Sequence, residues 1–119
     1  MFKKLSHPMM YVNDLERAVK FYNEKLNFKT RFHHPGGYAS LFNEEMNCRL
    51  DLHPTEANSK DVGFGPIIYF TTTDLDSDLT KLQKNGVKTG TPKTEGGSTR
   101  FVTFWDSEGN ALGLEEERR

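Results

Sequence analysis

The chain has 119 residues, which is enough for one domain with a hydrophobic core. Its formal net charge of −1, spread over interspersed acidic and basic residues, excludes the positive excess that is typical of proteins binding nucleic acids or anionic membranes. The single cysteine, Cys48, excludes an intrachain disulfide and favours a reducing, cytoplasmic setting. Lys3 and Lys4 are not followed by a long apolar run, so we expect neither a signal peptide nor a membrane span.

The N-terminal half begins with a predicted strand that leads directly into an amphipathic helix. Residues 5–12 alternate between two faces, and His7, Met9 and Tyr11 share one of them. Asn13, followed three positions later by Glu16, has the spacing of a helix-capping box. The apolar stripe of the helix needs a sheet to cover, and it consists of Leu15, Ala18, Val19, Tyr22 and Leu26.

Three more strands are predicted after this helix, at residues 27–32, 38–42 and 46–53. Glycine, proline and asparagine in the intervening segments favour turns. In the last of these strands, Arg49, Asp51 and His53 share the face opposite to the apolar side chains. The polar residues 54–64 then connect this half to the next one.

The second half repeats the first. Residues 66–72 form a predicted strand, and Thr73 with Asp76 repeats the capping spacing. Asp74 follows Asp14 by 60 positions, and the pair Gly96-Gly97 follows Gly36-Gly37 by the same offset. The second helix has an apolar stripe, followed by a glycine suited to a helix end, at Leu75, Leu79, Leu82 and Gly86. Strands are predicted at 87–89, 100–105 and 111–115, with a Gly-rich loop at 93–98 and a turn at 106–109.

The order strand, helix and three strands therefore occurs twice. We predict an α+β fold, a single domain of two βαβββ modules at about residues 1–54 and 65–119. Each sheet would be backed by one helix, which leaves the other sheet faces free to close around a cavity.

Several motifs extend this prediction to a known family. They are the segments at residues 7–22, 26–28, 73–76, 85–87 and 104–110. Together they resemble the vicinal oxygen chelate superfamily, which contains glyoxalase I, bleomycin-resistance proteins, fosfomycin-resistance enzymes and extradiol dioxygenases. The resemblance covers nearly the whole chain and implies this fold, but it leaves the activity open because one scaffold hosts many chemistries.

Metal enzymes of this family have four ligands that point into the cavity. The resemblance places His7 in the first strand and Asp51 in the fourth at two of these positions. The ligand position in the fifth strand is occupied by Ile67, or by Pro66 if the strand is shifted by one residue. In the eighth strand, Gly113 occupies the position of the family's glutamate. Two of the four ligands are therefore missing, both in the second module.

Two interpretations of the remaining ligands stay open. His7 and Asp51 could form a hydrogen-bonded polar pair that lines a pocket, because two ligands rarely hold a catalytic metal. Alternatively, His53 and Glu115 could join them around a displaced Zn, Ni, Mn or Fe ion, since each lies two positions beyond a family ligand position.

The predicted cavity face also carries aromatic, apolar and basic side chains. Such a mixed lining is typical of small-molecule pockets, although core packing explains each residue equally well. Arg49 could pair with Asp51 or hold an anionic ligand, and aromatic rings could stack on a flat one. The candidate ligand-binding residues are Met9, Tyr11, Tyr38, Arg49, Tyr69 and Trp105.

The favoured hypothesis is a metal-independent protein of the bleomycin-resistance type that binds a small organic molecule, without a cofactor. The resemblance implies a homodimer. The alternative is a metal-dependent enzyme related to glyoxalase I or to a dioxygenase, which uses His7 and Asp51 with substitute ligands. A third hypothesis, a structural or partner-binding domain, leaves the mixed aromatic and polar lining unexplained.

Overall fold

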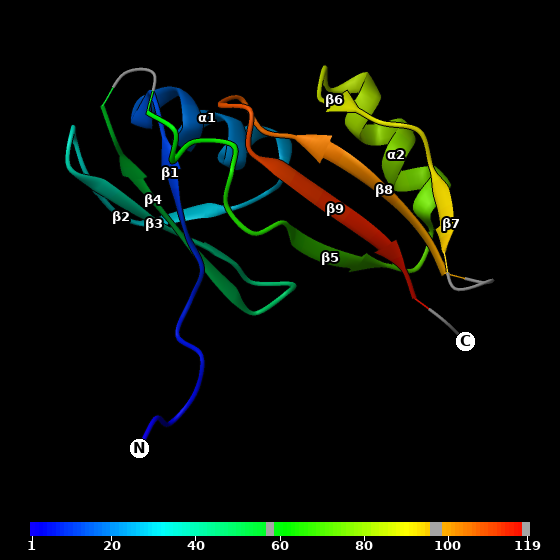
Figure 1. The fold of residues 1–119 in the computed structure, drawn as a ribbon, viewed down its shortest axis with the longest axis horizontal. Helices are drawn as coiled ribbons and strands as arrows, with labels where there is room; N and C mark the ends of the chain where they lie inside the picture. Colours follow the sequence, from blue (N-terminus) through cyan, green and yellow to red (C-terminus); the bar gives the residue numbers. More distant parts are fainter. Residues whose placement is uncertain (57–58, 96–98, 118–119) are drawn as a thin grey trace.

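The computed structural model describes residues 1–56, 59–95 and 99–117 and confirms the α+β fold of two βαβββ modules (Figure 1). The first module consists of β1 (Met9–Val12), α1 (Leu15–Lys25), β2 (Lys29–His34), β3 (Tyr38–Asn43) and β4 (Cys48–Pro54). The second consists of β5 (Ile68–Thr72), α2 (Leu75–Lys84), β6 (Lys88–Thr89), β7 (Lys93–Glu95), β8 (Thr99–Trp105) and β9 (Ala111–Glu116). The glycine pair at 96–97 lies outside the described residues.

Each module forms its own mixed sheet. The first has the order β1-β4-β3-β2, and the second has the order β5-β9-β8-β6 with β7 paired to β8. The edge strands β1 and β5 run parallel to their neighbours β4 and β9, respectively, whereas the remaining strand pairs are antiparallel. Figure 1 shows the two sheets next to each other, with α1 and α2 on the modules to which they belong.

Most strand boundaries differ from the predictions by one or two residues, and two differences are larger. The first strand begins at Met9 and not at residue 5, because Pro8 has no N–H for the ladder and contributes only its carbonyl, which accepts from Asp51. The N-terminal segment leaves the body of the molecule before this point (Figure 1). The predicted loop at 93–98 was wrong for Lys93–Glu95, which form β7 because polar composition does not prevent backbone pairing along β8.

The predicted helix caps were each one residue too early. Asp14, not Asn13, caps α1, and its side chain accepts a hydrogen bond from the Arg17 backbone nitrogen at 3.0 Å. Asp74, not Thr73, caps α2 in the same way. Aspartate combines a capping oxygen with a negative charge, which the positive end of the helix dipole favours. The repeat of aspartates 60 positions apart therefore identified the caps better than the capping-box spacing did.

The core lies between the helices and the sheet faces that they cover, which are the inner faces of the two sheets. The opposite faces, which neither α1 nor α2 covers, are the outer faces. All predicted stripe residues of α1 from Leu15 to Tyr22 are buried, and so are Leu75 and Leu82 of α2. Gly86 ends the second helix with a φ of 78°, as predicted, because glycine has no Cβ to oppose this angle. Among the described residues, no helix is long and apolar enough to cross a membrane.

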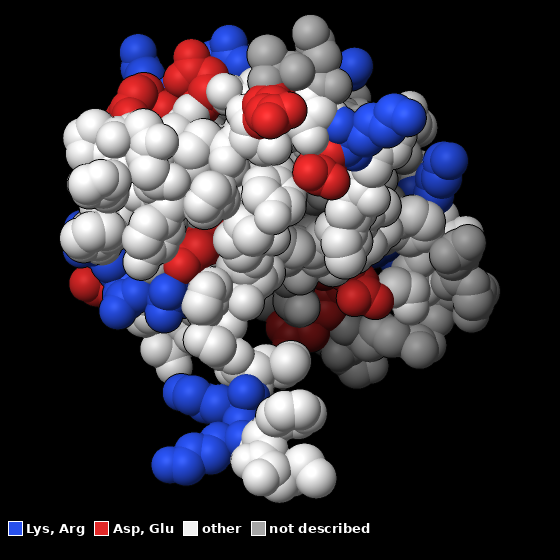
Figure 2. All heavy atoms as spheres, turned by 60° about the vertical axis from the view of Figure 1, so that its left-hand side comes forward, with Lys and Arg blue, Asp and Glu red and all other residues white. Residues whose placement is uncertain are grey.

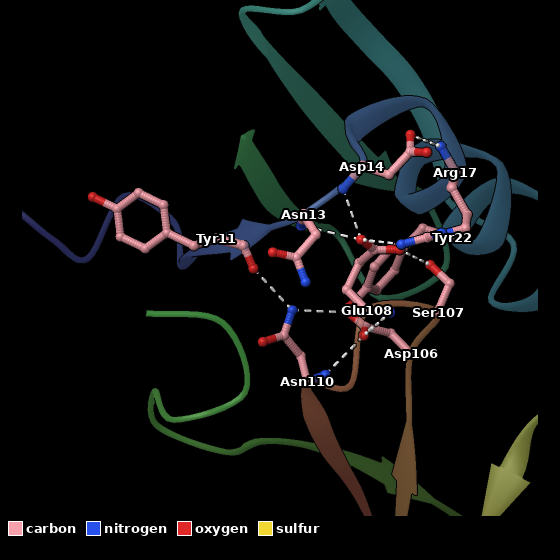
Figure 3. Close-up of polar contacts among 9 residues, drawn as sticks. All are labelled: Tyr11, Asn13, Asp14, Arg17, Tyr22, Asp106, Ser107, Glu108 and Asn110. Atoms are coloured by element: carbon pink, nitrogen blue, oxygen red, sulfur yellow. Dashed lines mark hydrogen bonds and ion pairs between the residues drawn. The ribbon is translucent and has the colours of Figure 1, made fainter. Parts of the chain in front are cut away.

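The turn between β8 and β9 joins the two modules (Figure 3). Glu108 Oε1 accepts hydrogen bonds from the backbone nitrogens of Asn13 and Asp14, and both carboxylate oxygens pair with Arg17. Asp106 accepts a hydrogen bond of 2.8 Å from the Tyr22 hydroxyl. The two sheets are thus held in a defined relation by buried polar contacts as well as by the shared core.

Candidate functional site

The outer face of the first sheet carries a buried carboxylate that several side chains contact. Asp51 on β4 is 3% exposed. Arg49, two positions earlier on the same strand face, donates from Nε to Oδ1 at 2.9 Å and from Nη2 to Oδ2 at 2.7 Å. His7 Nε2 lies 3.2 Å from Oδ2, and Ser6 Oγ lies 2.7 Å from His7 Nδ1. This arrangement lets His7 accept from Ser6 and donate to the carboxylate.

A second arginine reaches the same carboxylate through a serine. Ser40 on β3 lies directly opposite Asp51 in the register, and its hydroxyl helps to lower the pKa of that carboxyl. Arg31 Nη1 donates to Ser40 Oγ at 2.9 Å. A register shift between Thr30 and Phe32 leaves Arg31 out of the regular pairing of β2 with β3. The cluster therefore consists of one acid, two guanidinium groups, an imidazole and a hydroxyl.

The electrostatics of the cluster keep Asp51 ionised. Burial acts to raise the pKa of Asp51, but hydrogen bonds from Arg49 and Ser40 and the positive charge of Arg49 outweigh it, so the pKa lies below its ordinary value. Hydrogen bonding to the carboxylate in turn raises the pKa of Arg49. The predicted pairing of Arg49 with Asp51 is thus present, and so is the predicted contact of His7 with Asp51.

The outer face of the second sheet is built differently at the corresponding positions. Met9 pairs with Asp51 in the first sheet, and Tyr69 pairs with Gly113 in the second. Because the two parallel pairs correspond, Gly113 is the counterpart of Asp51, and Ile67 is the counterpart of His7. The Tyr69 ring covers Gly113 so closely that a Cβ at this glycine would lie 2.6 Å from Tyr69 Cε2.

Comparison with known proteins now decides the family. The sequence model of the Glyoxalase/Bleomycin resistance protein/Dioxygenase superfamily matches residues 4–114. The chain belongs to this superfamily. The resemblance to this superfamily that the sequence motifs indicated is therefore confirmed.

Individual proteins resemble the chain over nearly its full length. An uncharacterized Bacillus subtilis protein, YetH, is 28% identical and is matched over 98% of this chain and 100% of its own length. A superfamily member from Sphaerobacter thermophilus is 25% identical, with a TM-score of 0.78 and coverage of 97% and 98% of the two chains. TnmS3, an antibiotic binding protein from Streptomyces, is 24% identical over 99% of both chains, with a TM-score of 0.78.

The metal site expected in the superfamily's metal enzymes does not fit the residues of this chain. Ile67 offers no donor atom, and the Tyr69 ring takes the space that a side chain at position 113 would need. Both oxygens of Asp51 are already bonded to Arg49. An ion bound there would have to displace a guanidinium, and the part of the chain that the structure describes offers it only His7 and Asp51 as partners, fewer than such sites need.

The displaced metal site that includes His53 and Glu115 is not assembled either. His53 is exposed, its Nδ1 lies 2.7 Å from the Pro54 carbonyl, and its ring meets Tyr11 edge-on. Glu115 is exposed on β9. Within residues 1–56, 59–95 and 99–117, no three His, Cys, Asp or Glu side chains lie close enough to share an ion.

The candidate ligand-binding residues lie on the outer faces of the sheets, and the cavities along the described residues divide them. Met9 is 45% exposed and Tyr69 is 44% exposed, although both are large and apolar. Met9 and Tyr11 line a cavity of about 310 Å³ beside the connecting segment, and Arg49 lines another of about 690 Å³. Neither of these two cavities contains the remaining three candidates, which are Tyr38, Tyr69 and Trp105.

Trp105 lies on the outer face of the second sheet, at the end of β8. Val102 and Phe104 of the same strand are buried in the core, so alternation turns Trp105 to the opposite side. Lys88 Nζ lies 5.2 Å from the centre of the indole ring, a cation–π distance. The ring is thus half-buried under a neighbouring strand, and its outer part stays accessible.

Two residues of the cluster were missed by the sequence interpretation. Ser40 and Arg31 have no motif of their own, since single serines and arginines occur on most solvated strands. Ser40 becomes part of the cluster only through its register opposite Asp51, and Arg31 only through the shift in β2. The alternation of the predicted strand at 38–42 placed Ser40 on the same face as Tyr38, which is the one signal that was available.

Proposed function

We propose that this protein binds a small organic molecule between apolar and aromatic sheet faces, without a complete metal site, as a cytosolic homodimer. The observation that supports this most is the exposure of large apolar side chains on the outer faces of both sheets. They come from β1, β2, the segment before β5, and β5 itself, and they are Met9, Tyr11, Phe32, Ile67 and Tyr69. Large apolar patches that stay exposed mark sites of interaction in proteins.

A second copy of the chain is the partner that would complete such a site. The candidate residues Arg49 and Trp105 belong to different sheets, and the cavity of about 690 Å³ that Arg49 lines does not include Trp105. A homodimer that covers the outer faces would bury these residues and enclose a space between them. This supports a ligand site to which both copies contribute.

Binding is favoured over catalysis because the residues that would hold a metal are missing or engaged. Arg49 supplies the positive charge beside Asp51 that an ion would otherwise provide, and Tyr69 fills the space at Gly113. The similarity to TnmS3, an antibiotic binding protein, is compatible with this proposal at the level of the fold.

Calorimetric titration with the flat, neutral probe naphthamide tests the proposal. We expect binding that Tyr69→Ala and Trp105→Ala each weaken by about tenfold, because each removes a stacking surface. Met46→Ala serves as the comparison variant and should leave the affinity within about twofold, since Met46 is an exposed apolar side chain before β4 that lines neither of the two cavities with candidate residues. Equal affinities in all four proteins would contradict the proposal.

Metal content separates this function from the alternative one. Protein purified without a histidine tag should contain no stoichiometric metal, and Zn, Ni, Mn or Fe should leave its melting temperature unchanged. Stoichiometric metal that His7→Ala removes would instead support a metal-dependent lyase or dioxygenase.

Sedimentation equilibrium tests the homodimer, and a monomer at micromolar concentration would contradict that part of the proposal.

A further inference from the structure

A cavity next to the Asp51 cluster has a strongly basic lining. Its volume is about 690 Å³, and it lies between residues 4–8 and the strands β2 to β4. The lining contains Lys4, His7, Arg31 and Arg49 and no acidic residue. Figure 2 shows Lys and Arg side chains on this flank of the molecule, close to the base of the N-terminal tail.

The charges of this lining are only partly compensated. Asp51 balances Arg49, with which it shares two hydrogen bonds. Arg31 contacts the neutral Ser40, and among the described residues no carboxylate forms an ion pair with Arg31 or Lys4. The residues that line the cavity therefore carry a net positive charge, even though the whole chain has a formal charge of −1.

Both guanidinium groups are held in place before any ligand arrives. Arg49 is fixed by two bonds to a buried carboxylate, and Arg31 is fixed by one bond to Ser40, which is 1% exposed. Each group is planar and has further N–H donors beyond those bonds. Prepositioned donors reduce the entropy that is lost when a ligand binds.

We propose that this cavity binds the carboxylate of a small organic acid whose apolar body lies against Leu5, Pro8 and Phe42. The carboxylate accepts hydrogen bonds from Arg31 and from the free edge of Arg49. A carboxylate fits better than a phosphate, because the one fixed guanidinium without a counter-ion matches a single negative charge. This inference rests on the proposed function and narrows its ligand to monoanions.

Naphthoate and naphthamide are a matched pair of probes for this inference, since they differ in charge and hardly in shape. In calorimetric titrations at low salt, we expect naphthoate to bind about tenfold more tightly than naphthamide. Arg31→Gln should remove this difference while leaving the affinity for naphthamide unchanged. Raising the ionic strength should weaken only naphthoate, since screening acts on charge pairs.

Arg100→Gln is the matched control. It removes the same charge from an arginine that pairs with Asp76 on the second module and that does not line this cavity. This variant should retain the preference for naphthoate. The circular-dichroism melting curve of Arg31→Gln should match that of the unmodified protein, because Arg31 is exposed and Asp51 keeps its bonds to Arg49.

The other outcomes are also informative. Equal binding of both probes, unaffected by Arg31→Gln, would overturn this inference and leave the proposed function standing. Absence of binding for both probes would overturn both. Tighter binding of naphthyl phosphate than of naphthoate, with the same dependence on Arg31, would overturn the assignment of a carboxylate.

Discussion

Glu108 Oε1 accepts a hydrogen bond of 2.8 Å from the backbone nitrogen of Asp14, which lies 94 positions earlier in the chain. The side chain of Glu108 is fully buried and also pairs with Arg17 through both of its oxygens. The start of α1 is therefore stabilised by a residue of the other module, and the helix dipole favours the negative charge there. This contact couples the two modules.

Replacing this carboxylate should weaken the whole fold. Glu108→Gln keeps the shape of the side chain but removes the charge that Arg17 and the helix start bind. We expect the free energy of unfolding to fall by about 2 kcal/mol, which is typical of hydrogen bonds to a buried charged group. Urea unfolding followed by Trp105 fluorescence measures this loss. Glu44→Gln, at an exposed turn position, is the control and should change stability by less than about 0.5 kcal/mol.

Stability should also depend on acid through the same residue. Burial acts to raise the pKa of Glu108, but hydrogen bonds from Arg17, Asp14 and Ser107 outweigh it, so the pKa lies below its ordinary value. The unfolded chain then binds a proton more readily than the folded one, so stability decreases as the pH falls below about 4. Glu108→Gln should flatten this decrease in unfolding experiments across that range, and an unchanged slope would contradict the assignment. The lowered pKa of Asp51 acts in the same direction and remains in the variant.

The helix caps provide a test by neighbouring substitutions. Asp14→Ala removes the oxygen that accepts from Arg17 and should lower the free energy of unfolding by about 1 kcal/mol. Asn13→Ala should have a smaller effect, because only the backbone nitrogen of Asn13, which the substitution retains, bonds to Glu108. Thermal or urea unfolding of both variants checks the order. A larger effect of Asn13→Ala would restore the capping box as the correct interpretation.

Tyr69 and Gly113 should be coupled energetically. A methyl group at position 113 meets the Tyr69 ring, so Gly113→Ala must displace the ring and should lower stability by about 1 kcal/mol. In a Tyr69→Ala background the space is free, and the same substitution should have almost no effect. A double-mutant cycle from urea unfolding gives the coupling energy. Additive effects of the two substitutions would show that the ring does not occupy this space in solution.

Local patterns predicted much of the fold. The stripe of α1, the end of α2 at Gly86 and most strands follow from periods and turn residues, which depend on neighbours a few positions apart. The family motifs also showed that Ile67 and Gly113, which are not metal ligands, occupy two of the ligand positions. Where local rules failed, as for β7 and for Asn13 as a cap, pairing with another strand or contact with Glu108 decided the outcome.

The sequence by itself determined that this chain folds as two βαβββ modules, and it placed Ile67 and Gly113 at two positions where the family resemblance implies metal ligands. The three-dimensional structure alone decided which polar groups meet. Ser40 and Arg31 join Asp51 through cross-strand register, and Glu108 reaches α1 from another module. The physical reason is that periodicity assigns a side chain to a face, whereas its partner depends on the register and packing of segments far apart in the chain.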